Sequence, residues 1–148
     1  MSTSVTVETL QALSDRCPFN AWIGFRIVAI GKGTIKVMVP WRKEMVGIPE
    51  PVTLHGGVLA SIVDFTAANA IATLLGQATP TIDLRIDYHA VAKRGDLIAS
   101  GRVIRLGGTL GTAEAEVHDC EGRLIASGRG SFFAAKIVEK ARSEGIYP

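Results

Sequence analysis

The sequence has few cysteines and few aromatic residues, and it lacks any long uninterrupted apolar run. Its two cysteines, Cys17 and Cys120, lie far apart and belong to no CxxC pair, which argues against a disulfide framework or a zinc ribbon. The three histidines show no metal-ligand spacing. No segment reaches the ~18 apolar residues of a membrane span, and residues 1–10 lack the basic start and apolar core of a signal peptide. These absences predict a cytoplasmic protein with no bound metal and no membrane partner.

The chain also lacks a strong excess of either charge. It carries 16 Lys and Arg against 14 Asp and Glu, a net charge of +2, and the basic residues are scattered. Such a balance argues against nucleic acid as a partner, although a local basic patch for phosphate groups remains open. With 148 residues and 47% hydrophobic content, the chain is predicted to fold as a single domain, 1–148, without metal or disulfide support.

The most informative segment runs from His55 to Gly76. Apolar residues recur in it at spacings of three and four, and most other positions are Ala, Ser or Thr, which predicts a central helix that is apolar on nearly all sides. Asp64 is the only charged residue in this segment. A carboxylate among apolar neighbours costs several kcal/mol unless it is paired, hydrogen-bonded or protonated. Asp64 is therefore a candidate catalytic residue, with a buried interface residue as the alternative.

Two glycines open this helix. Gly56 and Gly57 let another molecule approach the backbone, and the free N–H groups of a first turn suit an oxyanion or a polarised carbonyl. The alternative is that they permit close helix packing. A stripe of small residues follows at helical spacing, comprising Gly57, Ser61 and Ala68 beside Asp64. This stripe predicts room for a slender substrate or for a second helix.

The rest of the chain alternates between strand patterns and turns. Residues 6–16 are typical of a short amphipathic helix, residues 41–54 of a loop, and residues 135–148 of a tail, either a short helix or frayed. Strands are predicted at 23–30, 34–39, 81–92, 97–105, 109–118 and 124–133. Short connections favour a mostly antiparallel sheet in which the last four strands form a meander. An apolar helix needs that sheet to curl around it and a further surface on its remaining side, so we expect an α+β protein that dimerises.

Several of these segments together resemble one known family. They are His55-Gly56-Gly57 before an apolar helix with Asp64, the strand that opens at Thr81, the turn at 92–96 and the hairpin at 107–110. In this order they are similar to the hotdog-fold acyl-CoA thioesterases of the PaaI type, over about residues 20–134. The resemblance implies a curved antiparallel six-stranded sheet wrapped around the long central helix, and the N-terminal helix predicted from the sequence pattern lies before this region, within residues 1–19. It also implies a homodimer that assembles into a homotetramer.

The resemblance further implies an activity and a set of site residues. The protein would hydrolyse the thioester of acyl-CoA, with a medium-length, long or aromatic acyl group, and would need no cofactor because coenzyme A is part of the substrate. The Gly56 N–H would polarise the carbonyl, Asp64 would be the base or nucleophile, and Thr81 would help to position water. His55 either holds the loop or contacts the substrate. The implied substrate-binding residues are Gly57, Ser61, Ile82, Lys93, Arg94, Gly108 and Thr109.

Helix geometry predicts that two subunits share each site. Gly56 and Asp64 are eight residues apart, which is about 12 Å along a helix at 1.5 Å per residue. Reacting atoms must come within about 3 to 3.5 Å of one another, and an aspartate side chain covers only part of the difference. Two antiparallel helices about a twofold axis would bring Gly56 of one subunit to Asp64 of its partner.

The sequence departs from the family pattern at Pro49. Many members have an asparagine six residues before the histidine, and here that position is proline, followed by Glu50. Either another group orients the water or the activity is altered, and a solvated surface role for Glu50 competes with a catalytic one. Two other functions stay open. One is a non-catalytic acyl-CoA-binding or regulatory module, and the other is dehydratase or hydratase chemistry, which generally pairs a histidine with the acid.

Overall fold

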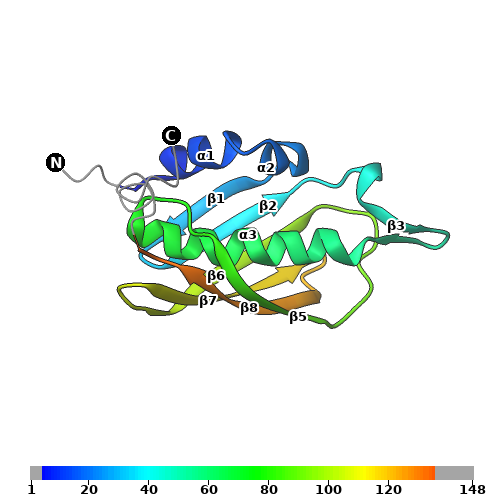
Figure 1. Ribbon diagram of the computed structural model, residues 1–148. Helices are drawn as coiled ribbons and strands as arrows, with labels where there is room; N and C mark the ends of the chain where they lie inside the picture. Colours follow the sequence, from blue (N-terminus) through cyan, green and yellow to red (C-terminus); the bar gives the residue numbers. More distant parts are fainter. Residues whose placement is uncertain (1–4, 136–148) are drawn as a thin grey trace.

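The computed structural model describes residues 5–135, and the predicted tail at 136–148 lies outside them (Figure 1). The described chain begins with two short helices, α1 (Val7–Asp15) and α2 (Pro18–Ile23). The Thr6 hydroxyl caps α1 by accepting the Thr9 N–H at 3.2 Å, as its place before an amphipathic run predicts. α2 was not predicted. It begins at a proline, where the missing N–H costs nothing, and ends at Gly24 with a φ of 82°.

The strands and remaining helices follow the predicted order with two differences. Their bounds are β1 Arg26–Gly31, β2 Thr34–Val39, η1 Lys43–Met45, β3 Val46–Pro49, β4 Val52–Leu54, α3 Gly56–Leu75, β5 Thr81–Tyr88, β6 Leu97–Leu106, β7 Leu110–His118 and β8 Leu124–Phe133. The first difference is that residues 41–54 are not a plain loop. They contain a 3-10 turn and the β3–β4 ribbon, which extends away from the body beyond the N-terminal end of α3 (Figure 1).

The second difference concerns the order of the sheet, which is β1-β2-β6-β7-β8-β5, antiparallel throughout. β6, β7 and β8 form the predicted meander, but β5 pairs with β8 at the far edge. The prediction of a four-strand meander was therefore wrong. Residues 89–96 are long enough to cross from one edge of the sheet to its middle, and local sequence patterns do not encode which strand becomes the neighbour.

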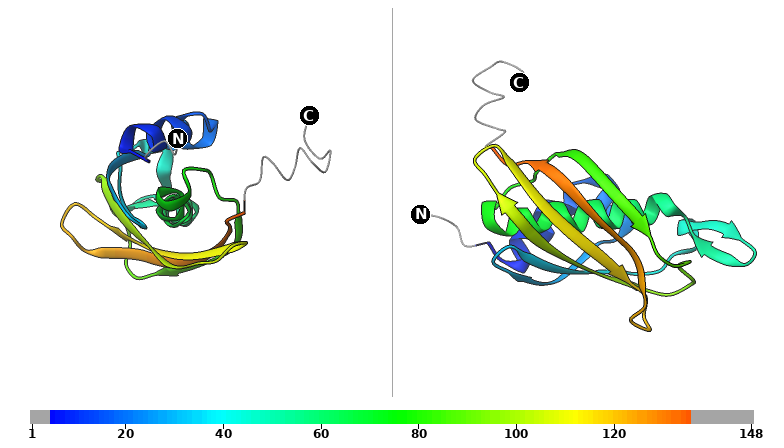
Figure 2. Two further views of the ribbon diagram at one scale, coloured as in Figure 1. Left: turned by 90° about the vertical axis from the view of Figure 1, so that its left-hand side faces the viewer. Right: turned by 90° about the horizontal axis from the view of Figure 1, so that it is seen from below.

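The sheet curves around α3, which lies along its concave face (Figures 1 and 2). Fully buried residues from both layers form the core, among them Ile62, Val63 and Ile71 of α3 and Val37, Val117, Ile125 and Phe132 of the sheet. Each such side chain contributes roughly 1.5–3 kcal/mol by leaving water. Glycine allows the close approach, since a Cβ on Gly101 of β6 would lie 2.8 Å from the Thr66 carbonyl oxygen of α3.

α3 is the one helix within residues 5–135 long and apolar enough to cross a membrane, but 56% of its most apolar stretch is buried inside the protein. Because the sheet and the N-terminal helices cover it, α3 is the core helix of this fold. The sequence had suggested that α3 is buried on nearly every side, but one side is open. Gly57 is exposed, and Ser61, Asp64, Ala68 and Asn69 are only half-buried. Their small or polar side chains leave one stripe of the helix open.

The two edges of the sheet differ. At the β1 edge the Gln11 side chain of α1 acts like a neighbouring strand, since its amide nitrogen donates to the Phe25 carbonyl at 3.0 Å and its oxygen accepts the Ile27 N–H at 2.8 Å. At the other edge, no strand of the described chain pairs with the outer side of β5. β5 also exposes Ile82 and Tyr88, at 57% and 55%. The start of the β1 edge is therefore covered, and the β5 edge is open in the described chain.

Candidate active site

Asp64 and Thr81 meet at the middle of α3 and the start of β5. The Thr81 hydroxyl donates a hydrogen bond to Asp64 Oδ1 at 2.6 Å, and Oδ2 accepts no hydrogen bond within residues 5–135. The carboxylate is half-buried, which corrects the prediction of an acid enclosed among apolar residues. Because one oxygen is held and the other is free, the group is oriented and can still contact a water molecule or a substrate.

Asp64 lies on the wall of a cavity of about 310 Å³, here called the Asp64 pocket, between the N-terminal helices, α3 and the segment before β5. Leu13, Phe19, Phe65, Ala68 and Ala72 supply its apolar walls, and Asn20, Ser61 and Asn69 are among its polar groups. The Asn69 side chain donates to the Phe65 carbonyl at 2.9 Å, and the Ser61 hydroxyl donates to the Gly57 carbonyl at 2.8 Å. A mostly apolar cavity with a few fixed polar groups is typical of a small-molecule site.

The first turn of α3 presents a second set of polar groups. His55 is the N-cap, and its Nδ1 accepts the Gly57 N–H at 2.8 Å. The imidazole rests against Gly57, where a Cβ would lie 3.0 Å from Nδ1, so this position favours glycine. The Gly56 N–H donates to no group in the described part of the chain. It is a free donor at the positive end of the helix, as the glycine pair predicts.

Tyr88, at the end of β5, contacts this turn and has no counterpart among the predicted site residues. Its hydroxyl donates to the Gly56 carbonyl at 2.9 Å, and the ring lies against Gly56, where a Cβ would be 3.4 Å from the hydroxyl oxygen. The sequence offered no signal for this role, since alternation along the strand placed Tyr88 on an apolar face. Tyr88 and Gly56 line a groove of about 360 Å³ with Thr53, Leu54, Leu59 and residues 89–92.

Gly56 and Asp64 thus border separate cavities within one chain. Neither residue lines the cavity of the other, and both lie in one continuous α-helix, so about 12 Å of helix axis separates them. A group bound at the Gly56 N–H of this chain is therefore out of reach of its own Asp64.

Lys93 and Arg94 lie exposed in the connection between β5 and β6, which leads away from the Gly56 groove. The Arg94 guanidinium lies over the Trp41 ring, 4.6 Å from its centroid, and the backbone N–H of Trp41 donates to the Asp96 carboxylate at 2.8 Å. A cation–aromatic contact of this kind restrains a long side chain. Among the residues that the structure describes, neither cation forms an ion pair with a carboxylate. Both remain available to an anionic ligand.

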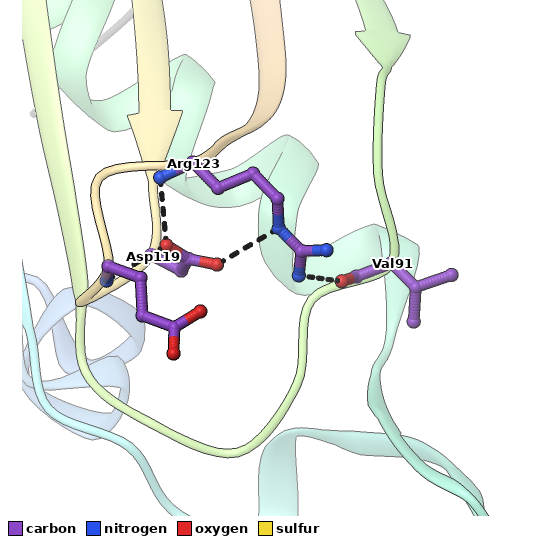
Figure 3. Close-up of polar contacts among 4 residues, drawn as sticks. Val91, Asp119 and Arg123 are labelled. Carbon is purple, nitrogen blue, oxygen red and sulfur yellow. Dashed lines mark hydrogen bonds and ion pairs between the residues drawn. The ribbon is translucent and has the colours of Figure 1, made fainter.

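Asp119 and Arg123, together called the clamp, also fix the connection between β5 and β6 (Figure 3). Asp119 accepts the backbone N–H of Arg123 at 2.9 Å, and the two side chains pair at 3.2 Å. Arg123 also donates to the Val91 carbonyl at 3.0 Å. The Arg123 N–H is the main cause that lowers the pKa of Asp119 below its ordinary value, so the carboxyl is ionised at neutral pH. This clamp engages the Arg123 side chain within the chain and holds the segment before Lys93.

The remaining predicted substrate-binding residues are spread over the molecule. Ser61 lines the Asp64 pocket, and Ile82 is exposed on β5 beside Thr81. Gly108 and Thr109 form the exposed β6–β7 turn, near the C-terminal end of α3, where neighbouring Gly111 approaches Ile71. Within one chain the structure does not bring this turn to Gly56 or Asp64. No group of three His, Cys, Asp or Glu side chains in residues 5–135 is arranged to hold a metal ion.

With this geometry known, comparison with other proteins identifies the family. The sequence pattern of the thioesterase superfamily matches residues 53–126, which include α3, Thr81 and the β5–β6 connection. A solved protein of this superfamily is 40% identical, with a TM-score of 0.83 over 86% of this chain and 96% of its own. The chain belongs to the thioesterase superfamily, and its fold is the hotdog fold.

Other relatives are more distant. Human acyl-coenzyme A thioesterase 13 is 29% identical over 82% of this chain and 89% of its own length. The Escherichia coli PaaI protein from the phenylacetic acid degradation operon is 21% identical, with a TM-score of 0.76 over 85% of this chain and 90% of that one. At that identity the PaaI structure supports the fold alone. The predicted family and fold are therefore confirmed, while the PaaI type is a distant likeness.

Proposed function

We propose that this protein hydrolyses acyl-CoA thioesters to a free acid and coenzyme A. One observation carries the proposal, namely that the Asp64 carboxylate, oriented by Thr81, borders a mostly apolar cavity in a thioesterase fold. The human relative, named as an acyl-coenzyme A thioesterase, supports the same substrate class. Thioester hydrolysis needs a polarised carbonyl, a base or nucleophile, and a site shielded from water. The protein's own groups can meet all three needs without a cofactor.

In the proposed reaction, the Gly56 N–H donates to the thioester oxygen, on which negative charge develops. Asp64 Oδ2, the oxygen free of Thr81, either removes a proton from the attacking water or attacks the carbonyl carbon itself. When Asp64 acts as base, water adds to the carbonyl carbon, the carbon–sulfur bond breaks, and the leaving thiolate takes up the proton that Asp64 removed from water. When Asp64 attacks, the thiolate leaves first, and water then hydrolyses the mixed anhydride, which releases the free acid, restores the Asp64 carboxylate and supplies the proton for the thiolate. Thr81 keeps the carboxylate in one orientation throughout, because its hydroxyl donates to Oδ1.

We further propose that two subunits complete each site. Antiparallel pairing of two open β5 edges about a twofold axis between Leu84 and Arg85 would set Tyr88 of one subunit opposite Thr81 of the partner subunit. Tyr88 contacts Gly56, and Thr81 contacts Asp64, so this pairing joins the two half-sites. The open stripe of Gly57, Ser61 and Ala68 permits the helices to approach. Assembly of such dimers into a homotetramer and a cytoplasmic location stay predictions.

The Asp64 pocket favours a medium-length or aromatic acyl group. Its volume of about 310 Å³ is at the small end of the range of about 300–1,000 Å³ found for ligand sites. A long alkyl chain would need further room between the subunits. The polar groups of Asn20 and Asn69 in the same cavity also suit acyl groups that are not purely aliphatic. We therefore expect aromatic and medium-length substrates to give the highest kcat/KM.

One observation favours a second candidate, a binding or regulatory module without turnover. Pro49 replaces the family's asparagine and lies in the β3–β4 ribbon, where Glu50 is exposed. A panel of acyl-CoA thioesters of differing chain length and aromaticity, followed by release of free thiol and by calorimetric binding, separates the two functions. Thiol release supports the thioesterase. Tight binding without thiol release from any substrate would contradict it and support the module.

Removal of the charges at Lys93 and Arg94 should weaken binding of the nucleotide end of the substrate and leave the chemical step unchanged. We expect Lys93→Gln and Arg94→Gln to raise KM for acyl-CoA severalfold, to leave kcat nearly unchanged and to weaken the salt dependence of binding. Thioesters of N-acetylcysteamine, which carry no nucleotide, serve as the matched substrates and should be unaffected. Equal losses for both substrate types would show that these residues act through the fold.

A further inference from the structure

The peptide group between Gly56 and Gly57 is bonded at both of its polar ends. Its carbonyl accepts the Tyr88 hydroxyl at 2.9 Å, and its N–H donates to His55 Nδ1 at 2.8 Å. One planar unit therefore connects a phenol on β5 to an imidazole at the helix cap. Hydrogen bonds linked through a peptide polarise one another, so the bond from Tyr88 strengthens the N–H that His55 accepts.

This connection determines where the proton of His55 lies. Since Nδ1 accepts the Gly57 N–H, the neutral imidazole must carry its proton on Nε2. The ring is exposed, and Nε2 has no partner within the described residues. Gly56 also has its N–H free. The first turn of α3 thus presents two unpaired donors, and the peptide that Tyr88 contacts fixes one of them, His55 Nε2.

We propose that Tyr88 is a positioning residue for the thioester reaction. Through the Gly56–Gly57 peptide, whose N–H is that of Gly57, it holds His55 as the tautomer that can donate from Nε2. Nothing in the family comparison or in the sequence pattern assigns this role. The role in turnover depends on the proposed function, whereas the tautomer of His55 does not. Donors set in advance toward developing charge accelerate a reaction because they need no reorientation during it.

The variant Tyr88→Phe tests the hydroxyl alone, because the ring stays against Gly56. We expect kcat to fall about threefold to tenfold, the effect of one neutral hydrogen bond, with KM nearly unchanged. Imidazole ¹⁵N shifts of His55 should show protonated Nε2 in the natural protein and a mixture of tautomers in the variant. Ser100→Ala, an exposed hydroxyl on β6, is the matched control and should change neither. An unchanged kcat together with unchanged His55 shifts in Tyr88→Phe would overturn the proposal.

The variant His55→Asn separates the cap from the donor. Asparagine replaces Nδ1 as cap acceptor but has no group at the place of Nε2, so we expect an intact fold with reduced kcat. The double variant should lose no more than His55→Asn alone, because residues that act through one connection are not additive. Full turnover in His55→Asn, or additive losses in the double variant, would overturn the role of Tyr88. If the natural protein releases no thiol, the proposed function fails, and the ¹⁵N shifts still decide the tautomer.

Discussion

Replacement of Asp64 by asparagine should nearly abolish thiol release. The amide has almost the same shape and can still accept the Thr81 hydroxyl, but it cannot remove a proton from water or attack a carbonyl. We expect kcat to fall by about 10²- to 10⁴-fold, the usual contribution of a base. Acyl-CoA binding, measured by calorimetry, should be largely retained because the walls of the Asp64 pocket are unchanged.

The control for Asp64→Asn is Asp83→Asn, which removes an exposed carboxylate from β5 close to Thr81. It should leave kcat and the melting temperature unchanged. If Asp64→Asn hydrolyses acyl-CoA as fast as the natural protein, Asp64 is neither the base nor the nucleophile and the proposed chemistry is wrong. Loss of the folded state in Asp64→Asn, seen by circular dichroism, would instead show that Asp64 is structural.

Two inactive variants should regain activity when their subunits are mixed. In Asp64→Ala the carboxylate is missing. In Gly56→Val the added side chain blocks the backbone donor, because its Cβ would already lie 3.4 Å from the Tyr88 hydroxyl oxygen. In a mixed dimer with shared sites, one site inherits both defects and the other neither. Joint unfolding and reassembly at equal amounts gives about half mixed dimers by random pairing, so about a quarter of natural activity should return.

The control for this mixing is Asp64→Ala reassembled with Asp64→Asn, in which every site lacks the carboxylate. No activity should return there, whatever dimers form. Native mass spectrometry measures the share of mixed dimers in each sample. Mixed dimers of Asp64→Ala and Gly56→Val that release no thiol would show that Gly56 and Asp64 act within one subunit.

Much of the fold could be predicted because its apolar patterns are long and regular. α3, β2 and β8 begin and end where the sequence pattern places them, since glycine, proline or charged residues bound each run. The β3–β4 ribbon was missed because two prolines and a glycine within residues 46–54 are typical of a loop. The position of β5 beside β8 was missed because strand pairing depends on the whole chain.

The sequence predicted the residues Asp64 and Thr81 of the site, but it did not predict the cavity around them or the contact of Tyr88. Asp64 and Thr81 were expected to act together, and the 2.6 Å hydrogen bond brings them into contact. The walls of the Asp64 pocket were not foreseen, because Phe19 and Asn20, which form part of them, lie on α2, a helix that was not predicted. Tyr88 gave no signal, since its contact with Gly56 joins residues 32 positions apart.

The unequal edges of the sheet bear on how large an assembly can grow. A sheet with two bare edges can add copies in both directions and form a fibre. Here the Gln11 amide already occupies the Phe25 carbonyl and the Ile27 N–H at the start of β1, two of the backbone groups that an added strand would need. Once two β5 edges pair, both outer edges of the joined sheet are β1 edges. A further copy that adds a strand there must first displace the Gln11 side chain, so a single glutamine opposes polymerisation beyond two copies.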